Sequence, residues 1–376
     1  MFLYITFFIL LALFTFVKPL QNKRIAFIIL ILLCLFVCFG YMTGSDWRAY
    51  ELRYEDYKNG LPEKYFNDIG YVIYSFLFYK LGVDFWIFLI FTKCVCFFIS
   101  IYYLRIYTKG KYQLGLLLFY CLYALFFYID NPLRNLISGT IFLVSYKYIY
   151  ERKQIKFLIC VLFAALFHLS AILVLPVYYI YIIKFSKKRM YIVIASIFLF
   201  SFIFNKIFYD LARVLSLYSS IVDEKTSFYL SESPIASIFS LGMALRLFLV
   251  ILIIEKQKQL IRYLRFGDFF VKISFIFVCY TMIGYAIPIM GRMQLFLFLP
   301  FIACCSVLPF TFSIRGKYKI YLLSFSIAFF TMITSITASY RYIPYSNYLS
   351  YLFKDKPNYQ ERSIYNFMNS PYNKDK

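Results

Sequence analysis

The sequence has little charge for its length. Only 15% of its 376 residues are charged, whereas 62% are hydrophobic. A soluble domain carries roughly 25% charged residues, so a water-facing surface over this much apolar material cannot be built. The scarcity of charge therefore excludes a soluble globular protein.

The sequence also lacks any cysteine spacing that is typical of metal ligands. Its nine cysteines include Cys94 and Cys96 in one apolar run and the neighbours Cys304 and Cys305 in another. A cysteine within an apolar run is usually a small hydrophobic residue. We therefore predict a structural role for these cysteines.

What the sequence does have is long apolar runs, and about 20 apolar residues are needed to span a bilayer. The first run, residues 2–17, has no basic n-region and no small-residue cleavage site, so we expect a retained helix and not a signal peptide. We predict an all-α, polytopic transmembrane protein with about ten full spans. The predicted spans are residues 2–17, 25–42, 85–104, 112–128, 135–150, 192–208, 236–254, 269–288, 293–312 and 320–338.

The basic residues indicate which side of the membrane each loop occupies. The net charge is +22, but the basic residues sit in short clusters between apolar runs, which argues against a nucleic-acid partner. One side carries 22 basic residues against three acidic ones, and the other 15 acidic residues fall on the opposite side. The basic clusters are Lys18/Lys23/Arg24, Arg105/Lys109/Lys111, Lys147/Arg152/Lys153/Lys156, Lys184/Lys187/Lys188/Arg189, Lys256/Lys258/Arg262/Arg265/Lys272 and Arg315/Lys317/Lys319.

Because cytoplasmic loops are enriched in Lys and Arg, this asymmetry predicts a multi-pass protein of a bacterial inner (plasma) membrane. Residues 1–340 form one transmembrane domain, with outer loops at 43–69 and 209–235. The N-terminus and a C-terminal tail, residues 341–376, are both predicted to be extracytoplasmic.

Two apolar segments do not fit a single crossing. Residues 70–81 are too short to cross the membrane. The span at residues 85–104 already supplies the one crossing that the charges of the flanking loops require, so we predict a re-entrant or interfacial segment. Residues 157–183 have basic clusters at both ends, so they cross twice or not at all. We predict a hairpin of two short helices, bent near residues 167–170. Irregular backbone at membrane depth is tolerated where protein or a water-filled cavity surrounds it, so both segments suggest a cavity that faces outward.

Charged residues in or beside membrane spans are costly and often functional. Several fall on the predicted outer side, together with the only histidine, whereas two cations lie deeper. The outer residues are Asp46, Arg48, Glu51, Arg53, Asp130, Arg134, His168 and Arg292, and the deeper cations are Lys93 and Arg246.

Each candidate also has a purely structural interpretation. Asp130 and Arg134 are four apart, so they can pair along a helix start. Asp46 can form a solvated pair with Arg48 or Arg53. Arg292 can extend to lipid headgroups, and a lone histidine is often a hydrogen-bonded core residue. The deeper cations Lys93 and Arg246 either pair with carboxylates or line the cavity. Three arginines from distant segments fall on the same predicted side, which argues against these interpretations. The planar guanidinium group of arginine is well suited to binding phosphate.

Five short motifs follow one another along the chain in the segments that carry these residues. They are Gly44-Ser-Asp-Trp-Arg-Ala-Tyr50, Asp68-Ile-Gly-Tyr71, Asp130-Asn-Pro-Leu-Arg134-Asn, Ala164-Ala-Leu-Phe-His-Leu-Ser-Ala171 and Gly291-Arg292. With these motifs in this order, the sequence resembles the EpsG-like proteins, within the wider Wzy group of exopolysaccharide and O-antigen polymerases. The resemblance covers about residues 20–310. The family often has Gln where this chain has Asn135, and an acidic residue where this chain has Ile69.

The resemblance implies a membrane glycosyltransferase that joins undecaprenyl-diphosphate-linked oligosaccharides on the outer face of the membrane. We expect membrane lipids as partners, with a chain-length regulator and a flippase as further candidates, and no nucleic acid. Arg48, Arg134 and Arg292 are the candidates for binding the diphosphate. Asp46 and His168 are the candidates for the general base. Supporting roles fall to Arg53, Asp130 and Arg246. No Asp-x-Asp motif or His/carboxylate cluster lies in the outer segments, so we expect no metal and no cofactor.

Three other functions remain open. A flippase or transporter of lipid-linked sugars also needs a cationic cavity, but should show internal repeats, of which the sequence has no convincing example. A membrane acyltransferase would use a single histidine in the membrane, although three outer arginines fit a phosphate-bearing donor better. A ligase that transfers finished chains differs only in its acceptor.

Overall fold

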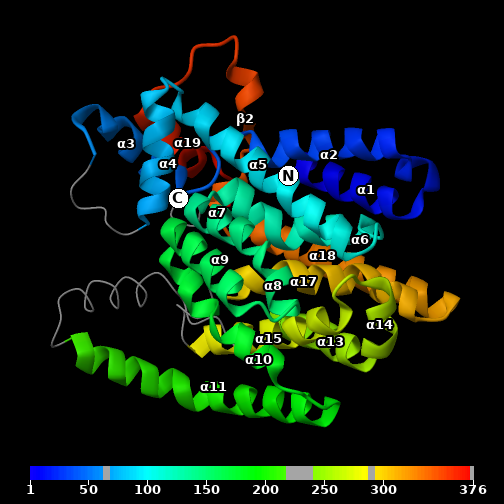
Figure 1. Ribbon diagram of the computed structural model, residues 1–376. Helices are drawn as coiled ribbons and strands as arrows, with labels where there is room; N and C mark the ends of the chain where they lie inside the picture. Colours follow the sequence, from blue (N-terminus) through cyan, green and yellow to red (C-terminus); the bar gives the residue numbers. More distant parts are fainter. Residues whose placement is uncertain (62–67, 217–239, 287–292, 373–376) are drawn as a thin grey trace.

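A computed structural model describes residues 1–61, 68–216, 240–286 and 293–372, with only the backbone described for residues 202–216 and 286. Within these ranges the chain is helical apart from loops and one two-stranded pairing, β1 with β2 (Figure 1). The predicted all-α class is therefore confirmed.

The helices and strands follow one another along the chain as α1 (Phe2–Phe16), α2 (Lys23–Cys38), β1 (Gly40–Tyr41), α3 (Trp47–Asp56), α4 (Ile69–Lys80), α5 (Phe85–Tyr107), α6 (Gln113–Phe119), η3 (Tyr120–Asp130), α7 (Leu133–Phe142), α8 (Ser145–Tyr150), α9 (Gln154–Phe167), η4 (Leu169–Val174), α10 (Pro176–Ile182), α11 (Lys187–Ser216), α13 (Leu241–Glu255), α14 (Gln257–Tyr263), α15 (Gly267–Ala286), α17 (Gln294–Val307), α18 (Ile314–Thr337), β2 (Ser346–Asn347) and α19 (Tyr359–Asn369). Short 3-10 turns occur at Lys18–Gln21, Tyr57–Asn59, Leu308–Thr311, Tyr340–Tyr342 and Tyr348–Tyr351.

Five stretches of the described chain are long and apolar enough to cross a membrane, as judged by length and composition. Three further apolar helices are shorter, namely Phe2–Phe16, Gln154–Phe167 and Leu169–Ile182. A multi-pass membrane protein is thus supported, whereas the count of about ten full spans stays a prediction. The five long stretches are Phe85–Tyr107, Gln113–Asp130, Gly267–Tyr285, Gln294–Thr311 and Ile314–Thr337.

The centre of the bundle is formed by α6, α15 and α17. Lipid tails are as apolar as the helices, so close packing and hydrogen bonds between helices hold such a bundle together. Phe277 of α15 stacks on Phe301 of α17 with ring centroids 4.6 Å apart. The Ser306 hydroxyl accepts a bond from the Gly115 amide at 3.0 Å and donates to the Lys111 carbonyl at 2.6 Å. This hydroxyl fixes α17 against the start of α6.

Two predicted spans have an internal irregularity. The predicted helix 135–150 is broken into α7 and α8 at residues 143–144. The predicted helix 112–128 begins as α6 and continues as a π-helix, η3, which ends where Asn131 takes a positive φ of 69°. A π-helix widens the turn and occurs frequently at functional sites. Neither break has a strong signal in the run of apolar residues.

The predicted hairpin at 157–183 is present. His168 has an extended backbone (φ −157°, ψ 115°), which ends α9 and turns the chain into η4 and α10. Phe157 of α9 stacks on Tyr178 of α10 at 5.2 Å. Gln154 also donates to the Tyr179 hydroxyl at 2.8 Å. The second helix therefore returns along the first, and the bend lies within the predicted residues 167–170.

The predicted short segment 70–81 forms α4, which lies against the end of α9. A 12-residue helix is about 18 Å long, too short for a hydrocarbon core of roughly 30 Å. A Cβ at Gly70 would lie 2.9 Å from the Leu166 Cβ, so the glycine allows α4 to approach α9 closely. This length and packing fit a re-entrant or interfacial segment.

The predicted cytoplasmic clusters meet at one end of the bundle. Lys109 donates to the Arg262 carbonyl at 2.9 Å, and the Arg265 amide donates to the Tyr107 carbonyl at 2.9 Å. Lys187 pairs with Glu255 at 2.9 Å. In Figure 1 this end, marked by α14, lies opposite to α3, α4 and α19. The charge clusters thus belong to one face, as the sequence predicts.

The C-terminal residues pack on the opposite end. β2 pairs antiparallel with β1, and the Tyr348 amide donates to the Phe39 carbonyl at 2.8 Å. Arg362 of α19 pairs with Glu51 of α3 at 2.7 Å, and both side chains are buried. The Tyr4 hydroxyl donates to the Tyr342 carbonyl at 2.8 Å, which ties α1 to the same end. The segment that the sequence assigns to a tail beyond residue 340 therefore closes over the end of the helices.

Gly44 makes the closest backbone approach at this end. It has a φ of 83°, and a Cβ there would lie 2.2 Å from the Ile129 carbonyl oxygen. Its amide donates to the Arg341 carbonyl at 2.9 Å, so the loop after β1 is pressed between η3 and the C-terminal segment. Only glycine combines this φ with this contact.

We expect Gly44→Ala to destabilise the protein much more than Gly110→Ala. Gly110 has nearly the same φ, 84°, but open space around its Cα, so its substitution isolates the backbone strain of about 1–2 kcal/mol. The clash at Gly44 should add about 1–3 kcal/mol. Thermal unfolding of both variants in detergent measures the difference, and equal losses would show that the loop does not pack as described.

Candidate active site

The loop after β1 brings Asp46 over the end of η3. The Ser45 amide and hydroxyl both donate to Asp130 Oδ1 at 3.0 Å, and the same hydroxyl lies 3.1 Å from Asp46 Oδ1. The Asp46 amide reaches the Asp130 carbonyl at 3.4 Å. Two carboxylates from segments far apart in sequence are thereby held around one serine.

Asp130 also receives a cation from the C-terminal segment. Arg341 pairs with Asp130 Oδ2 at 3.3 Å, and the Asp130 side chain is only 8% exposed. The sequence suggests a pair between Asp130 and Arg134 four residues later, but Asp130 pairs instead with Arg341. Arg134 is therefore free to pair elsewhere.

Arg134, in the first turn of α7, pairs with Asp68. One terminal nitrogen lies 2.6 Å from Asp68 Oδ2, and Nε donates to the Tyr50 hydroxyl at 3.3 Å. The guanidinium also lies 5.7 Å from the centroid of the Tyr50 ring. Asp68 is buried, whereas the Arg134 side chain is 30% exposed. One edge of this arginine is thus fixed by α3 and by the start of α4.

Asp68 links the pair to the bend of the hairpin. Its φ of 66° is left-handed, and its Oδ1 accepts from the Leu169 amide at 3.0 Å. His168 Nδ1 faces Asp68 Oδ2 at 3.6 Å. The extended backbone of His168, which ends α9, directs the imidazole toward this carboxylate. Asp68, Arg134 and His168 therefore form one polar cluster from three helices.

The cluster leaves several polar atoms unused. Both imidazole nitrogens of His168 are buried and have no hydrogen-bond partner in the described part of the chain. The same holds for Nε and one terminal nitrogen of Arg48, whose guanidinium lies 5.9 Å from the Trp47 ring. Native proteins pair nearly all buried polar groups, and exceptions call for a ligand, water or functional role.

Unpartnered buried polar atoms are concentrated at this end of the molecule. Of the twelve residues that carry such atoms in the described ranges, ten belong to β1 and the loop after it, α3, the start of α7, the hairpin bend or α19. This distribution indicates a polar binding site and not scattered packing defects. The ten are Tyr41, Thr43, Trp47, Arg48, Glu51, Asn135, His168, Ser170, Arg362 and Asn366.

The two outer carboxylates differ in their electrostatics. Burial, and then the neighbouring charge of Asp130, raises the pKa of Asp46 above its ordinary value. Burial alone would also raise the pKa of Asp68, but His168 and Arg134 beside it outweigh burial, so its pKa is lowered. Asp68 is therefore a fixed anion at neutral pH, whereas Asp46 binds a proton more readily.

Two other sequence candidates, Arg53 and Arg246, lie on α3 and α13. Arg53, on α3, lies near Tyr57 and Tyr71. Arg246, on α13, lies near Tyr285 of α15. Arg292 lies outside the described residues.

Lys93 provides the deepest polar contact beneath this end. It donates to the Tyr128 carbonyl at 3.0 Å and to Asn131 Oδ1 at 2.9 Å, so it pairs with neutral oxygens and not with a carboxylate. Asn131 in turn donates to the Thr43 carbonyl at 3.1 Å. This chain of bonds connects α5 to the loop that carries Asp46.

Sequence reasoning missed three residues that organise the site. Asp68 stands in a motif of the family resemblance, yet its role as partner of Arg134 and His168 had no local signal. Arg341 and Tyr50 contact Asp130 and Arg134 only because the tail and α3 fold onto this end. Within the described ranges, the one group of three close metal-ligating side chains is formed by cysteines of α2 and α5 and not by this site.

A helical membrane protein with an arginine–carboxylate–histidine cluster at one end is the class that fold and site define together. The model of the EpsG family matches residues 23–353, nearly the whole chain. The chain belongs to the EpsG family, which is a family of Wzy-like polymerases. No curated protein and no solved structure matches the chain.

We expect Asp68→Asn to destabilise the protein, because it removes the charge that Arg134 pairs with while keeping an oxygen for the Leu169 amide. Breaking a buried pair costs about 3–5 kcal/mol, and the partial exposure of Arg134 places this pair at the lower end of that range. Thermal unfolding at neutral pH measures the loss.

The control is Asp56→Asn, at the exposed end of the neighbouring helix α3. Surface changes of this kind alter stability by about 0.5 kcal/mol or less. Asp68→Asn behaving like this control would mean that the Asp68–Arg134 pair does not form.

Proposed function

We propose that this protein is a polymerase that joins undecaprenyl-diphosphate-linked oligosaccharide repeat units into O-antigen, capsule or exopolysaccharide. The reaction takes place on the outer face of the bacterial inner membrane. The observation that carries the proposal is the convergence of Asp68, Arg134 and His168, with Asp46 nearby. Membership of a Wzy-like polymerase family supports it.

The proposed transfer breaks one bond and forms one. A hydroxyl of the incoming unit attacks the anomeric carbon of the growing chain, and the bond from that carbon to the diphosphate oxygen breaks. The electron pair leaves with the lipid diphosphate, and the hydroxyl proton goes to a base. The protein must therefore supply cationic donors where the diphosphate charge develops and a base beside the acceptor.

We assign the base to His168. The anion of Asp68 faces Nδ1, which favours the tautomer with the proton on Nδ1 and leaves Nε2 free to accept one. Nε2 is buried and has no partner in the described chain, so its bonding capacity is unused and we assign it to the acceptor hydroxyl. Asp46 is the second candidate, because a carboxylate with a raised pKa also accepts a proton readily. In this assignment Asp68 is a positioning residue.

We assign the diphosphate to Arg48 and Arg134. Arg48 has two nitrogens without partners, and burial strengthens their attraction to an anion. Arg134 is fixed by Asp68 and Tyr50 but keeps an exposed edge. Arg292 remains a predicted third donor. Because these residues supply the charge, we propose that the transfer is independent of metal ions and of a cofactor.

We expect His168→Ala and Arg48→Ala to reduce the surface polymer to single repeat units. Loss of a general base lowers rates by about 10²–10⁴-fold, and loss of one donor to a developing charge by about 10²–10³-fold. The measurement is a gel of surface polysaccharide from a deletion strain that expresses each variant at wild-type level.

The matched control is Arg105→Ala, an exposed arginine at the opposite end of the bundle. A normal ladder in both His168→Ala and Arg48→Ala would refute the site. If repeat units instead accumulate on the cytoplasmic face in these variants, the protein is a flippase. If the variants lose polymerisation but finished chains are still transferred to their acceptor, the protein is not the ligase.

The proposed orientation predicts from which side of the membrane a labelling reagent can reach each end of the bundle. We expect Lys58→Cys, exposed after α3, to react with an impermeant maleimide in intact cells. Lys188→Cys, exposed at the start of α11, should react only after the membrane is opened. The wild-type chain, whose cysteines are buried or half-buried, serves as the blank. The reverse pattern would place the candidate site in the cytoplasm.

A further inference from the structure

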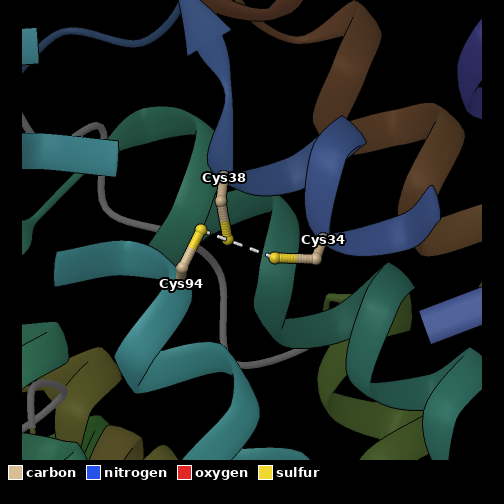
Figure 2. Close-up of side chains that lie close together, drawn as sticks. All are labelled: Cys34, Cys38 and Cys94. Atoms are coloured by element: carbon tan, nitrogen blue, oxygen red, sulfur yellow. Dashed lines mark hydrogen bonds between the residues drawn. The ribbon is translucent and has the colours of Figure 1, made fainter. Parts of the chain in front are cut away.

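Three cysteines from two helices meet beneath the candidate site. Cys34 and Cys38, four residues apart on one face of α2, meet Cys94 of α5. Their sulfur atoms all lie within 4.8 Å of one another, and the Sγ atoms of Cys34 and Cys94 are 3.6 Å apart. Figure 2 shows the three Sγ atoms turned toward a common point.

A buried cation lies beside these thiols. Lys93 is 0% exposed, and its charge acts on all three cysteines. Its hydrogen bonds go to the neutral oxygens of Tyr128 and Asn131, and no carboxylate pairs with it in the described part of the chain. A buried charge is costly without a partner of opposite sign. Thiolates bound to a metal ion would give this ammonium partners of opposite charge.

The sulfur positions fit the geometry of a bound metal ion. Zinc–thiolate bonds of about 2.3 Å place the sulfur atoms of a tetrahedral site about 3.8 Å apart. The Cys34–Cys94 separation of 3.6 Å is close to this value, and all three sulfur atoms lie within 4.8 Å, so small side-chain rotations would close the site.

We propose that Cys34, Cys38 and Cys94 form a binding site for one divalent ion of the zinc class. Binding releases the three thiol protons to solvent and forms three metal–sulfur bonds. The three thiolates are then balanced by the divalent ion and the ammonium of Lys93, which leaves no net charge in a medium of low dielectric constant. A monovalent ion such as Cu(I) would leave one negative charge uncompensated, so the charge balance favours a divalent ion.

The site would act as a structural clamp and not as part of the transfer chemistry. It joins α2 to α5, and Lys93 connects it through Asn131 to the loop that carries Asp46. The ion would therefore stiffen the base of the candidate active site. This inference does not depend on the proposed polymerase function.

The test uses the full-length protein purified in detergent with a phosphine reductant and treated with a chelator. Cd²⁺ or Zn²⁺ is then added, and sulfur-to-cadmium charge-transfer absorption and thermal unfolding are recorded. We expect one ion per chain, a charge-transfer band, and a rise in unfolding temperature. Cys94→Ser should weaken binding at least tenfold, and Lys93→Met should also weaken it, because the counter-charge is lost.

The matched control is Cys304→Ser, which removes a buried cysteine of α17 away from the cluster and should bind the ion like the wild type. The proposal is overturned if no band develops, or if Cys94→Ser and Cys304→Ser bind equally well. It is also overturned if the protein isolated without reductant contains a Cys34–Cys94 disulfide, since the cluster would then be a redox pair. Each variant is compared by gel filtration, so a misfolded variant is recognised before metal is added.

Discussion

The pair between Asp68 and Arg134 is the interaction on which the candidate site depends. It joins the start of α4 to the first turn of α7, and the same carboxylate accepts the Leu169 amide at the bend of the hairpin. In a medium of low dielectric constant such a pair stabilises the fold only if its remaining hydrogen-bonding positions are also occupied. Tyr50 and the Leu169 amide occupy two of them, and His168 Nδ1 faces Asp68 at 3.6 Å, so one ion pair fixes the positions of three helix ends.

A second pair, Asp130 with Arg341, performs the same role for the loop and the C-terminal segment. Asp130 accepts both the amide and the hydroxyl of Ser45, and thereby sets the place of Asp46 beside it. Gly44 makes this approach possible, because any side chain there would meet the Ile129 carbonyl. Asp68 and Asp130 are each paired with a separate arginine. Burial, and then the neighbouring charge of Asp130, raises the pKa of Asp46.

Much of the helical layout could be predicted from the sequence. Only long apolar runs can span a bilayer, and clusters of Lys and Arg mark the cytoplasmic loops, so both are signals that can be read locally. The hairpin bend at His168 and the short α4 both followed from counting charges on either side of an apolar run. The break between α7 and α8 and the π-helix before Asn131 did not. Both depend on how neighbouring helices pack, and hydropathy is nearly the same for a straight helix and an interrupted one.

The sequence by itself determined that the chain is an all-α membrane protein, which residues share a face, and which family it resembles. Tertiary structure decided the partners: Asp130 pairs with Arg341 and not with Arg134, Asp68 joins His168, and Cys34 meets Cys94 across 60 residues. The physical reason is that burial and charge count are properties of a segment. A pairing depends on the packing of two segments, and no local pattern records the distance between them.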